Sequence, residues 1–159
     1  MSHTAPDRMF EVLDETNENL IAIRVGKGTR TGYQELYSLL VEKSDQYGHI
    51  HVYEEVPNWT FGTFLTHLHG VLPDLRYGPD FDIDRYAAVG DSRWAKLLFD
   101  WWRVIRPIWP VAPNEMRYFD RTDRERALDW LSEGDRWQEG FVSLAANSTF
   151  SPRRWASRR

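Results

Sequence analysis

Histidines at alternate positions are the first residues in this sequence whose spacing suggests chemistry. His49 and His51 lie in an apolar stretch that predicts a strand, where residues two apart share a face. Two imidazoles on one face, with Glu54 or Glu55 nearby, contain donor atoms suited to a transition metal. The spacing matches no established ligand motif, however, and it also fits histidines that are structural or lie on the surface. We therefore predict no metal site.

Two predicted helix starts contain groups that could bind an anion or accept a phosphate. Gly90-Asp91-Ser92 precedes one helix, where backbone N–H groups can hold an anion, although capping by Asp91 or Ser92 explains the same residues. Thr60 precedes another helix and is a candidate phosphoacceptor, while Thr60 or Asn58 can equally serve as a cap. The sequence contains no P-loop, dinucleotide fingerprint or nucleophile elbow. We expect no enzymatic activity and no cofactor.

The helix predicted from residue 93 to about residue 105 is unusually apolar. Trp94, Leu98, Trp101 and Ile105 recur at the spacing of one helix face, which would normally be core. Further apolar residues lie outside this line: Leu97, Phe99, Trp102, Val104, Ile108 and Trp109. A helix that covers a sheet needs an apolar arc of only about 100°. The surplus is expected to meet the protein's own core, a second subunit, an apolar ligand or a membrane surface.

From this helix we predict a set of contact residues for an apolar ligand or a membrane. The set comprises Trp94, Leu98, Trp101, Trp102, Ile105 and Trp109. Three aromatic residues of the preceding predicted helix, Trp59, Phe61 and Phe64, are candidates for the wall of a pocket. Aromatic residues opposite a basic strip are typical of helices that lie in a membrane interface.

The elements that would position these residues alternate along the chain. Apolar runs predict strands at residues 10–13, 20–25, 49–56, 86–89 and 116–119. Helices are predicted between them, with Thr31 and Gln34 as one capping pair, Gly48 as a helix end, and Thr122 with Glu125 as another capping pair. The order β-β-α-β-α-β-α-β-α predicts an α/β fold with a mixed sheet of about five strands, covered by helices.

Length and charge predict a single domain with short extensions. We assign residues 9–134 to the domain, 1–8 to a flexible N-terminus and 135–159 to a basic-aromatic tail, expected to be flexible. Residues 136–159 hold five arginines and one acid, so their net charge is about +4, against -4 for the whole chain. This balance argues against nucleic-acid binding. The absence of cysteine, of a secretory signal and of a long apolar segment predicts a cytoplasmic protein that can associate peripherally with a membrane.

Four segments, taken in order, resemble the SpoIIAA-like family, which belongs to the wider group of STAS domains. They are Phe10-Glu11-Val12-Leu13, Val89-Gly90-Asp91-Ser92-Arg93-Trp94, Arg117-Tyr118-Phe119-Asp120 and Ala127-Leu128-Asp129-Trp130-Leu131, and the resemblance covers about residues 9–132. It implies a STAS-type mixed sheet, similar in fold to Sec14 or CRAL-TRIO lipid-binding domains, and no established enzymatic activity.

The resemblance also implies two kinds of function. Anti-sigma-factor antagonists of the STAS group act by protein contact and are switched by phosphorylation of a serine at a helix start. The matching segment here, Pro57-Asn58-Trp59-Thr60-Phe61-Gly62, has no serine. We therefore favour a non-enzymatic module that binds an apolar ligand or a membrane through the Trp-rich helix. A protein-interaction regulator is the alternative, and a homodimer is compatible with both.

Overall fold

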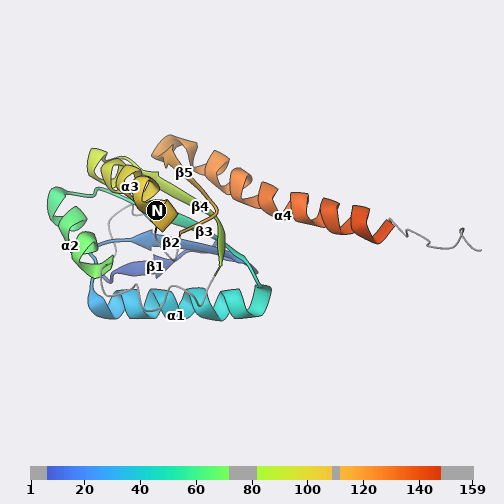
Figure 1. Ribbon diagram of the computed structural model, residues 1–159. Helices are drawn as coiled ribbons and strands as arrows, with labels where there is room; N and C mark the ends of the chain where they lie inside the picture. Colours follow the sequence, from blue (N-terminus) through green and yellow to red (C-terminus); the bar gives the residue numbers. More distant parts are fainter. Residues whose placement is uncertain (1–6, 72–81, 109–111, 148–159) are drawn as a thin grey trace, which may run out of the picture.

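A computed structural model describes residues 7–71, 82–108 and 112–147 (Figure 1). These residues form five strands, four α-helices and two short 3-10 helices. The strands are β1 (Phe10–Val12), β2 (Leu20–Val25), β3 (Ile50–Val56), β4 (Ile83–Gly90) and β5 (Glu115–Asp120). The helices are α1 (Arg30–Tyr47), α2 (Phe61–Val71), α3 (Arg93–Ile105), η3 (Arg106–Ile108), η4 (Arg121–Asp123) and α4 (Arg124–Asn147). The predicted order of elements is confirmed.

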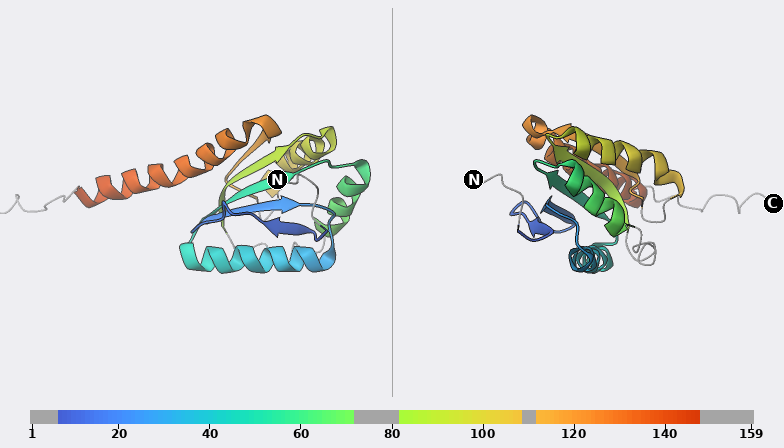
Figure 2. Two further views of the ribbon diagram at one scale, coloured as in Figure 1. Left: turned by 180° about the vertical axis from the view of Figure 1, so that it is seen from behind. Right: turned by 90° about the vertical axis from the view of Figure 1, so that its left-hand side faces the viewer.

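The sheet is mixed, as predicted, and its spatial order β1-β2-β3-β4-β5 follows the chain. β1 pairs with β2 antiparallel, and every other neighbouring pair is parallel. Right-handed crossovers that always advance in one direction place their helices on one face of the sheet. α1, α2 and α3 accordingly lie on one face and α4 on the other (Figures 1 and 2). Two separate layers of side chains result.

Strand alternation divides the core between these two faces. On the face covered by α1–α3, alternate residues of β2 and β3 pack with helix side chains, among them Ile21, Ile23, Val25, Ile50, Val52, Leu40 and Leu98. On the opposite face, Ala22, Tyr53, Ala87 and Val89 pack with Ala127, Trp130 and Leu131 of α4. Burial of these side chains stabilises the fold by about 1.5–3 kcal/mol for each large apolar residue. A parallel sheet is buried on both faces, so both layers of side chains are needed to cover it.

Three helix boundaries differ from those predicted. α1 is capped by Thr29, not by Thr31, because the Thr29 side chain accepts a hydrogen bond from the N–H of Gly32 at 3.0 Å. η4 occupies the predicted start of the last helix at Thr122, so α4 begins at Arg124. α4 does not end at Gly134 but continues to Asn147 and extends past the sheet edge (Figure 1). The predicted tail therefore includes part of α4, and residues 148–159 lie outside the described residues.

Other predicted boundaries are confirmed. Gly48 ends α1 with φ +82°, a left-handed conformation that suits glycine, and its N–H donates to Ser44 O at 2.8 Å. Ser92 caps α3 by accepting from the N–H of Trp94 at 3.2 Å. The Ser92 hydroxyl also donates to the Trp59 carbonyl at 2.6 Å, which ties the start of α3 to the loop before α2.

Candidate ligand-binding cavity

A cavity of about 150 Å³ lies between the sheet and the helices α1 and α3. Its walls are mainly aliphatic and aromatic and include Val25, Val52, Leu40, Trp59, Leu98 and Trp102. A cavity of about this size can take up a benzene-sized molecule. The geometry therefore provides a small, mainly apolar cavity inside the layer of side chains between sheet and helices.

One carboxylate faces this apolar space. Glu54 of β3 is flanked in the sheet by Ile23 and Ala88, and its Oε2 accepts a short hydrogen bond from the Tyr86 hydroxyl. Burial raises the pKa of Glu54 to about 6, although the Tyr86 hydrogen bond acts in the opposite direction. At neutral pH the side chain is an ionised acceptor, and below about pH 6 it becomes a neutral donor and acceptor.

A second polar group lies at the α1 end of the cavity. His67 of α2 is 4 % exposed, and its Nε2–H donates to the Gly26 carbonyl at 2.7 Å. The carbonyl can only accept, so Nδ1 carries no proton and accepts from the Tyr33 hydroxyl at 2.5 Å. Trp59 stacks on the ring at a centroid distance of 4.4 Å. Burial lowers the pKa of His67, which keeps the imidazole neutral at pH 7.

The predicted contact residues of α3 fall on different sides of the helix. Leu98 and Trp102 line the cavity, whereas Trp94 contacts Phe61 and Phe64 of α2. Of the stripe Trp94, Leu98, Trp101 and Ile105, which was expected in the core, only Leu98 is buried, because the helix is rotated about its axis relative to the prediction. The buried residues are Ala95, Leu98 and Phe99 because the small Ala95 lets the helix approach the sheet, which leaves Trp101 at 41 % exposure. Ile105 is partly buried, and Trp109 lies outside the described residues.

The three residues proposed for a pocket wall also separate. Trp59 is 5 % exposed, lines the cavity and donates its indole N–H to the Val25 carbonyl. Phe61 and Phe64 stack on one another beside Trp94 and are not part of the cavity lining. Thr60 caps α2, because its hydroxyl oxygen accepts from the N–H of Thr63 at 3.3 Å.

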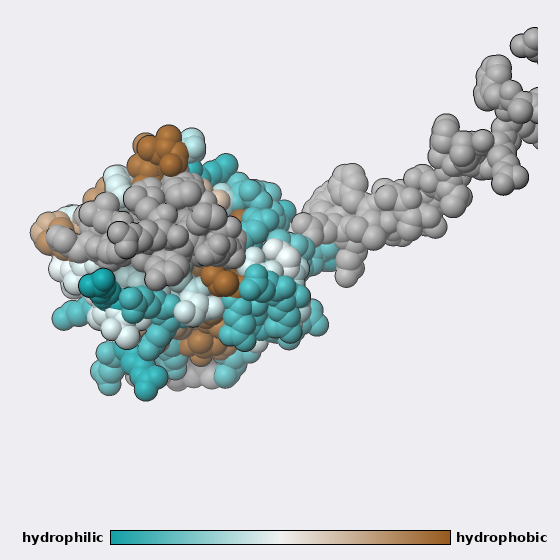
Figure 3. Space-filling model, turned by 60° about the horizontal axis from the view of Figure 1, so that its bottom comes forward, coloured by the Kyte–Doolittle hydropathy of each residue, from teal (hydrophilic) through white to brown (hydrophobic). Residues whose placement is uncertain are grey.

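Large apolar side chains are exposed along α2 and α3. This α2–α3 patch is defined by Phe61, Leu65, Leu97, Trp101, Val104 and Ile108, which are between 36 % and 83 % exposed. Hydrophobic areas also interrupt the largely hydrophilic face shown in Figure 3. On α3 and the following η3, Leu97, Trp101, Val104 and Ile108 recur at the spacing of one helix face, and large exposed apolar surfaces often mark sites of contact with a protein or a membrane. Among the described residues, no helix has the length and apolar character needed to cross a bilayer.

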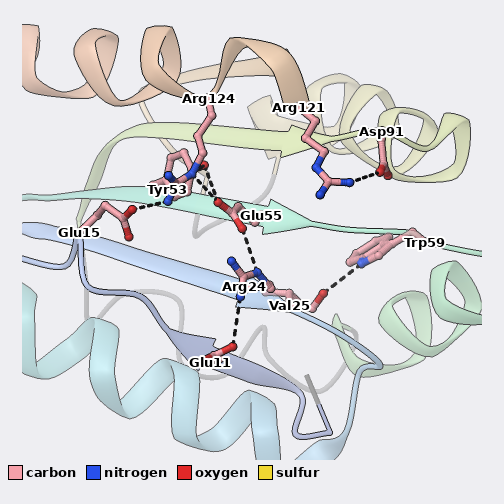
Figure 4. A network of polar contacts seen from close by, with 10 residues as sticks. All are labelled: Glu11, Glu15, Arg24, Val25, Tyr53, Glu55, Trp59, Asp91, Arg121 and Arg124. Atoms are coloured by element: carbon pink, nitrogen blue, oxygen red, sulfur yellow. Dashed lines mark hydrogen bonds and ion pairs between the residues drawn. The ribbon is translucent and has the colours of Figure 1, made fainter. Parts of the chain in front are cut away.

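A network of charged residues spans the opposite side of the sheet (Figure 4). Glu55 accepts from Arg24 at 2.9 Å and from Arg124 at 2.7 Å, and Arg24 and Arg124 also pair with Glu11 and Glu15. Burial would raise the pKa of Glu55, but hydrogen bonds from Tyr53, Arg124 and Arg24 outweigh it and lower the pKa. Two arginines and three glutamates thus form a network that joins β1, β2, β3 and α4.

The polar groups of the cavity were not predicted from the sequence, although the pattern of β3 contained a signal for Glu54. Ile50, Val52, Glu54 and Val56 alternate along β3, so period-two spacing places Glu54 among core residues. The acid that lies beside the histidine pair was also not identified from the sequence. Glu54 faces the cavity and Glu55 the charged network, whereas the carboxylate beside His49 and His51 belongs to Asp135.

The mixed five-stranded sheet, with three helices on one face and one on the other, is a STAS-type fold. A family model described as SpoIIAA-like matches residues 20–132, and the chain belongs to this family. The match begins at β2, so β1, which carries the first segment of the predicted resemblance, lies outside it. No curated protein and no solved structure matches the chain.

Proposed function

We propose that this protein is a non-enzymatic module that binds an apolar small molecule in the cavity beneath α1 and α3. The cavity carries the proposal, because it combines apolar walls with the buried acceptor pair of Glu54 and Tyr86. Binding sites for small molecules are usually mainly apolar, with few polar groups that fix orientation. A ligand with one hydroxyl or amide N–H beside a small apolar body suits this arrangement.

The size of the cavity sets a limit on the ligand. A volume of about 150 Å³ is smaller than the about 300–1,000 Å³ of typical ligand pockets. A long acyl chain would therefore fit only if a covering helix moved, and α3 is the natural candidate because one of its sides is exposed. The ligand is therefore either a compact aromatic or branched molecule that fits the cavity, or a lipid whose binding requires α3 to move.

Thermal unfolding with a small aromatic probe tests the cavity. Toluene at ten times its Kd should stabilise the protein by about 1.4 kcal/mol. Ala88→Leu, which adds bulk at a buried residue of the cavity wall, should abolish that shift. Val104→Leu adds a methylene at a residue that is 76 % exposed on α3 and should leave it unchanged. Equal shifts in both variants, or none in the wild type, would contradict the proposal.

Extraction of the gently purified protein with organic solvent, followed by mass spectrometry, addresses the natural ligand. A stoichiometric compound of benzene to indole size is expected if α3 stays in place. A stoichiometric fatty acid, isoprenoid or phospholipid would instead show that a helix moves to admit it. An empty protein in this experiment, together with an absent toluene shift, would refute ligand binding.

The α2–α3 patch supports peripheral attachment to a membrane as a second function of the same module. Arg93, Lys96 and Arg103 lie on the same helix, and basic residues beside exposed aromatic ones favour anionic interfaces. Sedimentation with phosphatidylserine-containing vesicles should fall when Leu97 and Trp101 are both changed to serine. The matched control changes Val12 and Tyr47, which are exposed elsewhere, to serine. Equal sedimentation of the two double variants would contradict this role.

Protein contact through the α2–α3 patch is the alternative, and family membership supports it. In this case the module would resemble an anti-sigma-factor antagonist, with Thr60 at the edge of the patch as the candidate phosphoacceptor. Light scattering would detect a homodimer, and recovery from the native host would detect a different partner. This alternative would be contradicted if the protein were monomeric, bound vesicles through Leu97 and Trp101, and yielded no protein partner on recovery from the host.

A further inference from the structure

His49, His51 and Asp135 form a cluster of potential metal ligands at the start of β3. The Nε2 of His51 lies 3.0 Å from Asp135 Oδ1, and the Nε2 of His49 lies 3.7 Å from the same oxygen. One ligand atom from each residue lies within 4.8 Å of the other two. Bonds of about 2.0–2.2 Å place neighbouring ligand atoms of a tetrahedral Zn²⁺ site about 3.4 Å apart, so the three side chains would draw closer together around an ion.

The buried His51 ring has a nitrogen without a hydrogen-bond partner. His51 is 1 % exposed, and its Nδ1 is unpaired among the described residues, with the Oδ2 of Asp84 at 4.0 Å. When Nε2–H donates to Asp135, Nδ1 carries no proton and is left unsatisfied. A cation on Nε2 would move the proton to Nδ1, which faces the Asp84 carboxylate. Metal-bound histidines almost always donate their second N–H to such an acceptor.

The backbone around the cluster fits the same interpretation. A Cβ at Gly134 would lie 2.9 Å from Cε1 of His51, so glycine allows α4 to approach the imidazole and bring Asp135 beside it. Asn19 donates to Asp135 Oδ1 at 2.9 Å and orients the carboxylate. The nearby Arg85 directs its guanidinium towards the Trp130 carbonyl and Glu115. Two of its three guanidinium nitrogens are thereby paired, while Nε has no hydrogen-bond partner among the described residues.

We propose that His49, His51 and Asp135 bind a divalent transition-metal ion of the Zn²⁺ class. Two imidazole nitrogens and one carboxylate suit Zn²⁺ or Co²⁺, and the carboxylates of Asp135 and Asp84 balance the charge. The side chains of His49 and Asp135 are 30 % and 42 % exposed, which leaves access for the ion and for a water ligand. The site lies on the α4 face of the sheet, so it is separate from the cavity and independent of the proposed function.

Titration of the untagged, chelator-treated protein with ZnCl₂ by calorimetry is the first test. One Zn²⁺ per chain is expected, and Co²⁺ should give visible d–d bands of a low-coordinate site. His49→Gln and Asp135→Asn should each weaken Zn²⁺ binding about 100-fold, and Asp84→Asn about 10-fold. Asp129→Asn, at an exposed acid on the same helix, is the matched control and should bind like the wild type.

A second measurement separates metal binding from a purely structural role of the cluster. Long-range ¹⁵N correlation spectra should show His51 protonated at Nε2 without metal and at Nδ1 with Zn²⁺. His49 is partly exposed, so His49→Gln retains the fold even if Asp135→Asn does not, and this variant keeps the test valid. Absence of 1:1 binding in the wild type, wild-type affinity in His49→Gln, or an unchanged His51 tautomer would each overturn the proposal.

Discussion

Glu54 is an acid on the apolar face of a parallel sheet, where burial opposes its ionisation. Because its pKa is about 6 in the folded protein and 4.5 as the ordinary value, the folded state binds more protons between these two values. Stability contributed by the neutral carboxyl is therefore complete below about pH 4.5 and lost as pH rises through 6. At neutral pH the ionised, buried Glu54 therefore lowers the stability of the ligand-free protein.

Replacement of this acid by its amide tests the pKa argument directly. Glu54→Gln keeps an acceptor for Tyr86 and removes the buried charge, so it should raise the free energy of unfolding by about 2 kcal/mol near pH 7.5. Near pH 4.5, where the acid is already mostly neutral, the gain should shrink towards zero. Urea denaturation at both pH values gives the comparison. Glu35→Gln, at an exposed acid of α1, should change neither value, and a pH-independent effect of Glu54→Gln would contradict the assignment.

The hydrogen bond between Tyr33 and His67 is a second contact that can be tested at this scale. Tyr33→Phe removes the donor and leaves Nδ1 of a buried imidazole unsatisfied, which should cost about 1–3 kcal/mol of stability. Tyr47→Phe, at an exposed tyrosine of the same helix, should cost little. Urea denaturation of both variants at pH 7.5, about one unit above the ordinary histidine pKa, measures the difference. Similar stabilities of the two variants would mean that the hydrogen bond adds nothing.

At the scale of elements, Gly134 allows α4 to lie close to the sheet. Alanine normally stabilises a helix interior by about 0.5–1 kcal/mol relative to glycine. Here its Cβ would be forced to within 2.9 Å of the His51 ring, so Gly134→Ala should destabilise the protein by about 1–2 kcal/mol.

The matched control for this substitution is Ser132→Ala, which removes an exposed side chain two residues earlier in α4. It should leave the stability within about 0.5 kcal/mol of the wild type. Unfolding curves in urea measure both variants. If Gly134→Ala were more stable than the wild type, the close approach of α4 to β3 would be incorrect.

At the scale of the whole molecule, local patterns predicted the fold because each element expresses its own period. The largely apolar runs of β2 and β3 mark strands that are buried on both faces, and β-α-β order implies right-handed crossovers. The spatial order of the strands, β1-β2-β3-β4-β5, was not predicted. The rotation of α3 escaped prediction because apolar residues surround that helix, so periodicity alone does not select the buried side. Asp135 and His51 are 84 residues apart in sequence, and only the folded chain brings them together.

Domain organisation gives the last prediction, which concerns the residues after α4. Ala127, Trp130 and Leu131 supply the packing, and Asp135 supplies the contact with His51. A chain that ends at Asn147 should therefore keep its free energy of unfolding within about 0.5 kcal/mol. The shortened chain loses the arginines at 153, 154, 158 and 159, each worth about 1 kcal/mol beside an anionic membrane, so vesicle binding at low salt should fall steeply. The full-length chain with these four arginines changed to glutamine is the control and should lose vesicle binding equally. A stability loss of about 2 kcal/mol or more on shortening would instead place residues 148–159 against the domain.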